Sequence, residues 1–84
     1  MKAPTNRVVF KEKYGFWVNK LEYGDEPTSR HFTQLAAVAS AKEMLRKEGG
    51  GTLIIRGPNG LIRDRVDVHP GGGIFVVRTG SGYR

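Results

Sequence analysis

The first quarter of the chain contains two short stretches in which apolar and β-branched residues dominate. Residues 7–11 read Arg-Val-Val-Phe-Lys and residues 16–23 read Phe-Trp-Val-Asn-Lys-Leu-Glu-Tyr. This composition favours strands, and the glycine at position 15 indicates a turn between them. In the second stretch apolar side chains fall on both faces of the strand. The pattern therefore predicts two strands but does not decide which face meets a helix. The polar segment 24–30 that follows is expected to be a loop.

The pattern changes to a helical period after Thr33. The Thr33 hydroxyl suits an N-cap, and residues 34–48 are mostly good helix formers. Three glycines at 49–51 are expected to end the helix, at least one of them in the left-handed conformation. The predicted apolar face is centred on Val38, Ala41 and Leu45 and flanked by Leu35, Ala37 and Met44.

The segment after the glycines predicts a hairpin around Gly57-Pro58-Asn59-Gly60, with two registers open. One register has a type I turn with a glycine bulge, and the other has a two-residue turn at Asn59-Gly60. The sorting of side chains by burial favours the two-residue register. That register places Leu53, Ile55, Ile62 and Val66 on one face and Ile54, Arg56, Arg63 and Arg65 on the other.

These elements predict an α+β fold, in which one helix packs on a small antiparallel sheet in the order β-β-α-β-β. Residues 1–6 are expected to form a flexible arm, and residues 7–68 a single domain. Residues 69–84 combine a glycine-rich linker, a candidate fifth strand at 74–77 and a frayed tail.

Composition and charge narrow the function classes. The chain has 84 residues and no cysteine, which excludes disulfides, thiolate metal sites and thiol catalysis. No apolar run has the length of a signal peptide core or a membrane helix, so we expect a cytoplasmic protein without a membrane partner. Fourteen Lys and Arg against eight Asp and Glu give a net charge of +6, which attracts polyanions.

The sequence contains no recognisable reaction centre. Asp64, Asp67 and His69 are close in sequence, but their spacing matches no metal-ligand motif. Neither glycine cluster precedes a helix, so neither resembles a phosphate-binding loop. We therefore expect a protein that is not an enzyme and that has no metal or cofactor.

The arginine-bearing strand face is the strongest candidate for a binding site. Its predicted members are Lys20, Arg56, Arg63 and Arg65, which would contact the phosphates of DNA or RNA. Exposed aromatic residues such as Tyr14 or Phe16 could stack on unpaired bases. The alternative interpretation is a solvated face on which arginine stems cover Ile54 for solubility.

A second hypothesis is that the chain binds protein, in the first instance a second copy of itself as a homodimer. An apolar strand that follows a glycine tether can pair with a sheet edge in the same chain or in a partner. The residues predicted for this self-association are Ile74, Phe75, Val76 and Val77.

The order of these motifs resembles the small bacterial family known as domain of unknown function 2188. The resemblance rests on the aromatic strand Gly15-Phe16-Trp17-Val18, the Thr33-capped helix, the junction at residues 49–55 and the turn at residues 57–62. It covers roughly residues 7–68 and implies a β-β-α-β-β domain. It brings no activity, cofactor or catalytic residue to this chain.

Overall fold

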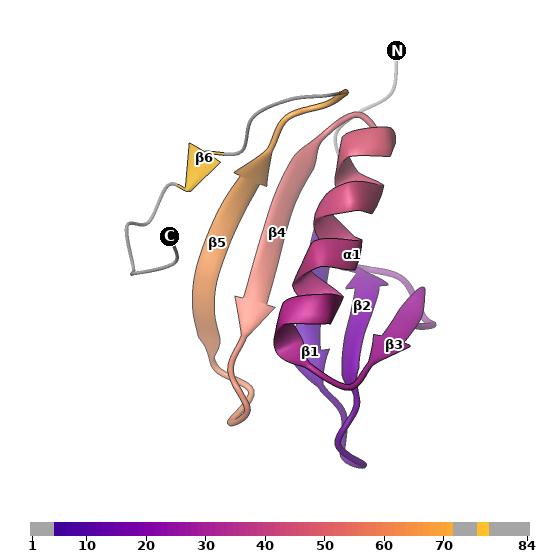
Figure 1. Cartoon of the computed structure of the whole chain (residues 1–84), viewed down its shortest axis with the longest axis vertical. Coiled ribbons are helices and arrows are strands. Elements are labelled where there is room, and N and C mark those ends of the chain that lie inside the picture. Colours follow the sequence, from indigo (N-terminus) through magenta and orange to yellow (C-terminus); the bar gives the residue numbers. More distant parts are fainter. Residues whose placement is uncertain (1–4, 72–75, 78–84) are drawn as a thin grey trace.

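The fold consists of one helix packed on one face of a mixed sheet (Figure 1). The computed structural model describes residues 5–71 and 76–77. It confirms the α+β class. The elements are β1 (Arg7–Lys11), β2 (Trp17–Leu21), β3 (Ser29–His31), α1 (Gln34–Lys47), β4 (Gly51–Arg56), β5 (Ile62–Val68) and β6 (Val76–Val77).

The strand order, β3-β2-β1-β4-β5-β6, differs from the expected antiparallel sheet. The central pair β1 and β4 is parallel, and the other pairs are antiparallel. The cause is the return path of the chain through α1, which brings the start of β4 beside the start of β1. There the Thr5 N–H donates to the Gly50 carbonyl at 3.2 Å. A helical connection of this kind is what parallel strands require.

Strand β3 was not expected, because residues 24–30 read as a polar loop. Ser29 and His31 pair with Asn19 and Trp17 of β2. The Ser29 hydroxyl also shares a polar cluster with Asn19 and Ser40 of the helix. Tertiary hydrogen bonds therefore make a strand from residues of low intrinsic strand preference. β2 is shorter than predicted, since a turn bond from the Gly24 N–H to the Leu21 carbonyl ends it.

The helix forms as its sequence predicts at both ends. The Thr33 hydroxyl accepts from the Ala36 N–H at 3.1 Å, which is the predicted N-cap. At the other end Gly49 has φ +100°, and the Gly50 N–H donates to the Leu45 carbonyl at 2.7 Å. This closing bond satisfies a carbonyl that the helix leaves open, and it needs a left-handed residue at position 49.

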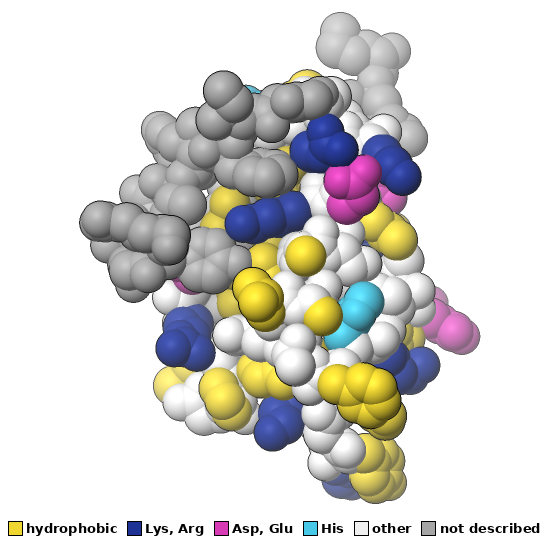
Figure 2. Space-filling model, viewed as in Figure 1, with side chains coloured by type: hydrophobic (Ala, Val, Ile, Leu, Met, Phe, Trp, Pro, Cys, Tyr) yellow, Lys and Arg dark blue, Asp and Glu magenta, His cyan; other side chains and the backbone are white. Residues whose placement is uncertain are grey.

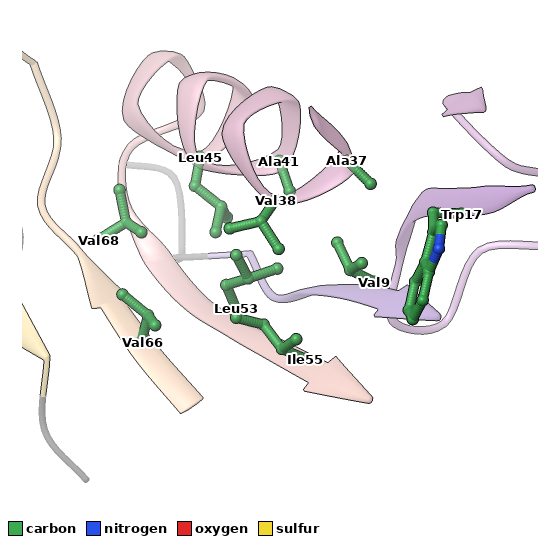
Figure 3. Packing of buried hydrophobic residues seen from close by; sticks show 10 residues of the cluster. All are labelled: Val9, Trp17, Ala37, Val38, Ala41, Leu45, Leu53, Ile55, Val66 and Val68. Carbon is green, nitrogen blue, oxygen red and sulfur yellow. The ribbon is translucent and has the colours of Figure 1, made fainter. Parts of the chain in front are cut away.

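The core lies between α1 and the sheet (Figure 3). Leu35 was expected at the margin of this core but is exposed, because it lies roughly 100° around α1 from the centre of its buried residues. The core side chains are Val9, Trp17, Ala37, Val38, Ala41, Leu45, Leu53, Ile55, Val66 and Val68.

Within the described residues no helix is long and apolar enough to cross a membrane.

The β4–β5 hairpin combines the two registers that the sequence left open. At the turn, the Gly60 N–H donates to the Gly57 carbonyl at 2.9 Å and Gly60 has φ +85°, as in a type I turn with a glycine bulge. A second irregularity between Ile55 and Arg56 then shifts the pairing. Beyond it Leu53 pairs with Val66, as the two-residue register requires.

This extra bulge moves Ile62 from its predicted face and leaves Arg63 out of the strand pairing. Ile62 pairs with Arg56 and is half exposed, whereas the two-residue register had placed it in the core. Asp64 pairs with Ile55, as the two-residue register requires, and is buried. A bulge accommodates one extra residue on one strand, so the alternation of faces restarts after it.

The last described strand, β6, lies on the free edge of β5. Val77 pairs with Val66, and Val76 pairs with Asp67. These are two of the four residues of the candidate fifth strand; Ile74 and Phe75 lie outside the described residues. The domain predicted for residues 7–68 contains α1 and strands β1 to β5.

Candidate nucleic-acid interface

The sheet face opposite α1, here called the outer face, carries a row of four side chains across four strands. Lys20 pairs with Val8, Val8 with Ile54, and Ile54 with Arg65. Residues that pair directly lie on the same face of a sheet, and their neighbours along each strand lie on the other. Val9, Leu53 and Ile55, which adjoin Val8 and Ile54 along their strands, belong to the core beneath α1 (Figure 3). The row is therefore cation, apolar, apolar, cation on the outer face.

A second row lies beside the first. Arg30 pairs with Val18, and Val18 pairs with Phe10. Phe10 and Arg56 each directly follow the paired residues Val9 and Ile55 in parallel strands, so they are neighbours on the outer face. The second row thus also has cations flanking an apolar centre.

The two rows enclose a hollow of about 350 Å3. Its floor is apolar and nearly buried, since Val8 and Ile54 are only 8% and 6% exposed. Three cations and one carboxylate lie around it, which leaves a net positive charge. The lining residues are Val8, Phe10, Lys11, Lys20, Glu22, Ile54, Arg56 and Gly60.

Backbone carbonyls fix two of these cations at the rim. Lys20 Nζ donates to the Gly24 carbonyl at 2.7 Å, and Arg56 Nη1 donates to the Gly60 carbonyl at 2.7 Å. An ammonium has three donors and a guanidinium has five. Each side chain therefore keeps further N–H groups for an anion while one contact restricts its conformation.

The predicted group of four cations is only partly brought together. Lys20 and Arg56 line one hollow, and Arg65 lies next to it through its pairing with Ile54. Arg63 lies at the bulge and lines a separate hollow of about 640 Å3 at the β4–β5 turn. Its Cδ is 3.7 Å from the position that a Cβ on Gly57 would occupy. The bulge therefore places Arg63 against the turn.

Arg30, at the β3 edge of the second row, is paired. Its Nε and Nη2 donate to Glu12 Oε1 and Oε2 at 3.0 and 3.2 Å. This hydrogen bond and the charge of Glu12 raise the pKa of Arg30 above its usual value. The Arg30 charge is thus balanced locally, and it is a weaker anchor for an external anion than Lys20 or Arg56.

Sequence reasoning missed Phe10 and Lys11, and it singled out other aromatic residues. Tyr14 is 85% exposed in the β1–β2 turn, and the Phe16 ring contacts Phe32 at a centroid distance of 5.4 Å. Neither Tyr14 nor Phe16 lines the hollow between Lys20 and Arg56. Alternation along residues 7–11 already sets Val8 and Phe10 apart from Val9. What the sequence lacked was the parallel pairing of β1 and β4, which places Phe10 beside Arg56.

On the helix side of the molecule, charges of opposite sign lie next to each other (Figure 2). Arg46 Nη2 is 2.9 Å from Glu43 Oε1, and Lys47 Nζ is 3.8 Å from Glu43 Oε2. The hydrogen bond from Arg46 lowers the pKa of Glu43. Burial lowers the pKa of Lys42, and the charge of Asp64 opposes that shift. These basic residues are engaged with carboxylates, which makes the helix side a poorer anion site.

The polar groups between α1 and β1 to β3 form a structural clamp. Arg7 is 2% exposed and donates from Nε and Nη2 to both carboxylate oxygens of Glu48, at 3.2 and 2.8 Å. Its Nη1 donates to Asn19 Oδ1 and Thr28 Oγ1 at 3.1 and 2.9 Å. A bidentate pair of this kind fixes two elements in one geometry. Here it joins β1 to the C-terminus of α1.

A Ser–His contact lies at the edge of this clamp. Ser29 Oγ is 2.8 Å from His31 Nε2, and it also lies 3.3 Å from Ser40 Oγ. A nucleophile pair of the triad type needs a third group that orients the base and donors for an oxyanion. Since Ser29 is shared with Ser40 and Asn19, the contact is explained as part of the packing of β3 on α1. Among the described residues no group of three His, Asp or Glu side chains could hold a metal ion.

The chain belongs to the bacterial family described as "uncharacterized protein conserved in bacteria", domain of unknown function 2188, whose model matches residues 7–68. That span contains both rows of the outer face. No curated protein and no solved structure matches the chain.

Proposed function

We propose that this protein is a small, non-enzymatic binding module that contacts nucleic acid through the outer face of its sheet. The observation that carries the proposal is the hollow in which Lys20 and Arg56 stand over an apolar floor. The net charge of +6 supplies long-range attraction to a polyanion. A cytoplasmic location, where DNA and RNA are both accessible, is part of the same proposal.

The charge distribution supports this face over the others. Around the hollow Lys11, Lys20 and Arg56 outnumber Glu22, and Arg65 extends the positive surface toward β5. On the helix side Arg46 and Lys47 share one carboxylate. Phosphate contacts by Lys and Arg provide most of the affinity of nonspecific nucleic-acid binding. Within the part of the chain that the structure describes, the outer face therefore offers more positive charge to an anion than the helix side does.

The test is a fluorescence anisotropy titration of labelled oligonucleotides at several salt concentrations. The double variant Lys20→Gln/Arg56→Gln removes the two rim cations, and Lys13→Gln/Lys47→Gln removes the same net charge away from the outer face. We expect the first variant to weaken binding about 10-fold or more. The slope of log affinity against log salt concentration should also become shallower by about 2, since two phosphate contacts are lost.

Equal losses in the two double variants would contradict the proposal, because affinity would then follow net charge alone. Circular dichroism of both variants serves as the control for folding. Retained binding in Lys20→Gln/Arg56→Gln would likewise overturn it.

A second candidate function, self-association, is favoured by the pairing of β6. Of the described residues, only Val76 and Val77 bond to the outer edge of β5, a strand of seven residues. The same edge bonds can be made by the β6 of a second copy, so that two chains exchange this strand. In this proposal the C-terminal segment with Ile74, Phe75, Val76 and Val77 provides the contact.

Sedimentation equilibrium of the full chain and of a chain ending at residue 69 tests this second candidate. A dimer that dissociates on truncation supports strand exchange. A full chain that remains monomeric at high micromolar concentration excludes it.

A further inference from the structure

We propose that the nucleic acid bound by the outer face is single-stranded, and that one unpaired base lies on the Phe10 ring between Lys20 and Arg56. This inference rests on the proposed function and deepens it. It starts from the floor of the hollow, which consists of Val8, Phe10 and Ile54. A surface that only neutralised phosphates would have no use for such a floor.

The arrangement of the rows fits one strand lying across the sheet. Lys20 on β2 and Arg56 on β4 are separated by two strand spacings, or roughly 10 Å across the sheet, and Phe10 of β1 lies between these strands. Phosphates can then contact the cations at the ends while a base covers the middle. Aromatic side chains on an open sheet face stack bases in this way in sequence-tolerant single-strand binding.

A duplex does not use these features well. Its base faces are stacked on one another, and it presents phosphates and groove edges to a protein. The polar groove edges would then lose their hydration against an apolar floor, which offers them no hydrogen bond in return. An unpaired base, by contrast, has an apolar face that Phe10 can cover.

The volume of the hollow limits how much of the strand it can hold. About 350 Å3 is near the lower end of the roughly 300–1,000 Å3 typical of small-ligand sites. We therefore place a single base in the hollow and its flanking phosphates at the rim. Glu22, the one carboxylate of the lining, accepts from Asn6 Nδ2 at 3.2 Å at the β2 end of the hollow.

The experiment compares three labelled 12-mers on the full chain: oligo(dT), an abasic strand with the same phosphates, and a duplex. The protein variants are Phe10→Leu, which keeps an apolar side chain without the ring, and Phe10→Tyr, which keeps the ring. Tyr14→Leu is the matched control, because it removes an exposed aromatic residue that does not line the hollow.

We expect the wild-type protein to prefer oligo(dT) over the abasic strand and the duplex. Phe10→Leu should weaken oligo(dT) binding about 5- to 100-fold and leave abasic binding unchanged, since stacking is lost but phosphate contacts are not. Phe10→Tyr and Tyr14→Leu should bind oligo(dT) as the wild type does.

The possible failures are distinguishable. Equal wild-type affinity for oligo(dT) and the abasic strand would overturn the stacking inference while leaving the proposed function intact, and this comparison needs no variant. Tighter binding of the duplex than of either single strand would also overturn it. Absence of binding to all three probes at low salt would overturn both the inference and the proposed function.

Discussion

The two faces of this sheet bury apolar residues by different means. On the helix side Leu53, Ile55 and Val66 are at most 2% exposed beneath the side chains of α1. On the outer face Val18 and Ile54 are 0% and 6% exposed, although no described helix covers them. The long stems of Lys and Arg can cover apolar surface while their charged ends stay in water. The helix side is therefore a core covered by a helix, and the outer face is an apolar floor bordered by cationic side chains.

The polar groups of the two faces differ in the same sense. Arg7, on the helix side, uses three nitrogens on Glu48, Asn19 and Thr28, and it is almost fully buried. Lys20 and Arg56, on the outer face, each make one contact with a backbone carbonyl at the rim. The Arg7 side chain thus uses four of its five N–H donors within the fold, whereas Lys20 and Arg56 keep most of theirs for a ligand. The same residue types are thus tied into the fold on one face and left with donors for a ligand on the other.

The largest expected effect is on stability, and it should differ between two adjacent residues of β4 that lie on opposite faces of the sheet. Leu53→Ala empties a fully packed site under α1 and should destabilise the protein by about 3 kcal/mol. Ile54→Ala, on the outer face, should cost about 1–2 kcal/mol, because flexible stems can settle into the space. Chemical denaturation of both variants measures the difference. Equal losses would mean that the outer face is packed as rigidly as the core.

A smaller loss is expected from the clamp. Arg7→Met keeps the apolar stem but leaves Glu48 without its bidentate partner and removes the donor to the buried Asn19 Oδ1. The loss should be about 2 kcal/mol, below the roughly 3–5 kcal/mol of a fully buried pair, because the Glu48 side chain is 30% exposed and can regain water. Thermal unfolding of Arg7→Met, with Glu48→Gln as the control that retains the shape, tests this. Unchanged stability in Arg7→Met would show that the clamp serves some other purpose.

The local rules of the sequence predicted the helix and its caps, since Thr33 and Gly49 act through bonds within a few residues of themselves. They did not predict β3, which depends on Asn19 and Ser40 from elsewhere in the chain. The candidate site shows the same division. Alternation along one strand related Arg56 to Ile54, but joining them to Phe10 required the parallel pairing of β1 with β4. The bulge that separates Arg63 from the other predicted cations could not be predicted either, because the local sequence shows only a turn that is compatible with two registers.

The outer-face cations should matter little for stability. Arg56→Gln loses one hydrogen bond to the Gly60 carbonyl, at a half-exposed site. The free energy of unfolding should change by no more than about 0.5 kcal/mol, as for most surface substitutions. Urea denaturation alongside the binding titration checks whether recognition and folding are separable on this face. A loss above about 1 kcal/mol would place Arg56 among the residues that hold the hairpin.

The smallest effect belongs to the ion pairs on the solvent side of α1. The hydrogen bond from Arg46 lowers the pKa of Glu43 in the folded protein, so the ionised form favours folding. This contribution is present above the unfolded pKa of Glu, about 4.3, and is lost as the pH falls through the lower folded value. The melting temperature of Glu43→Gln should therefore lie slightly below that of the wild type at pH 7 and coincide with it near pH 2. Since the pair is exposed, the difference at pH 7 should also shrink in high salt. A difference that is independent of pH would assign the effect of the substitution to helix propensity and leave the Arg46 charge without a role in folding.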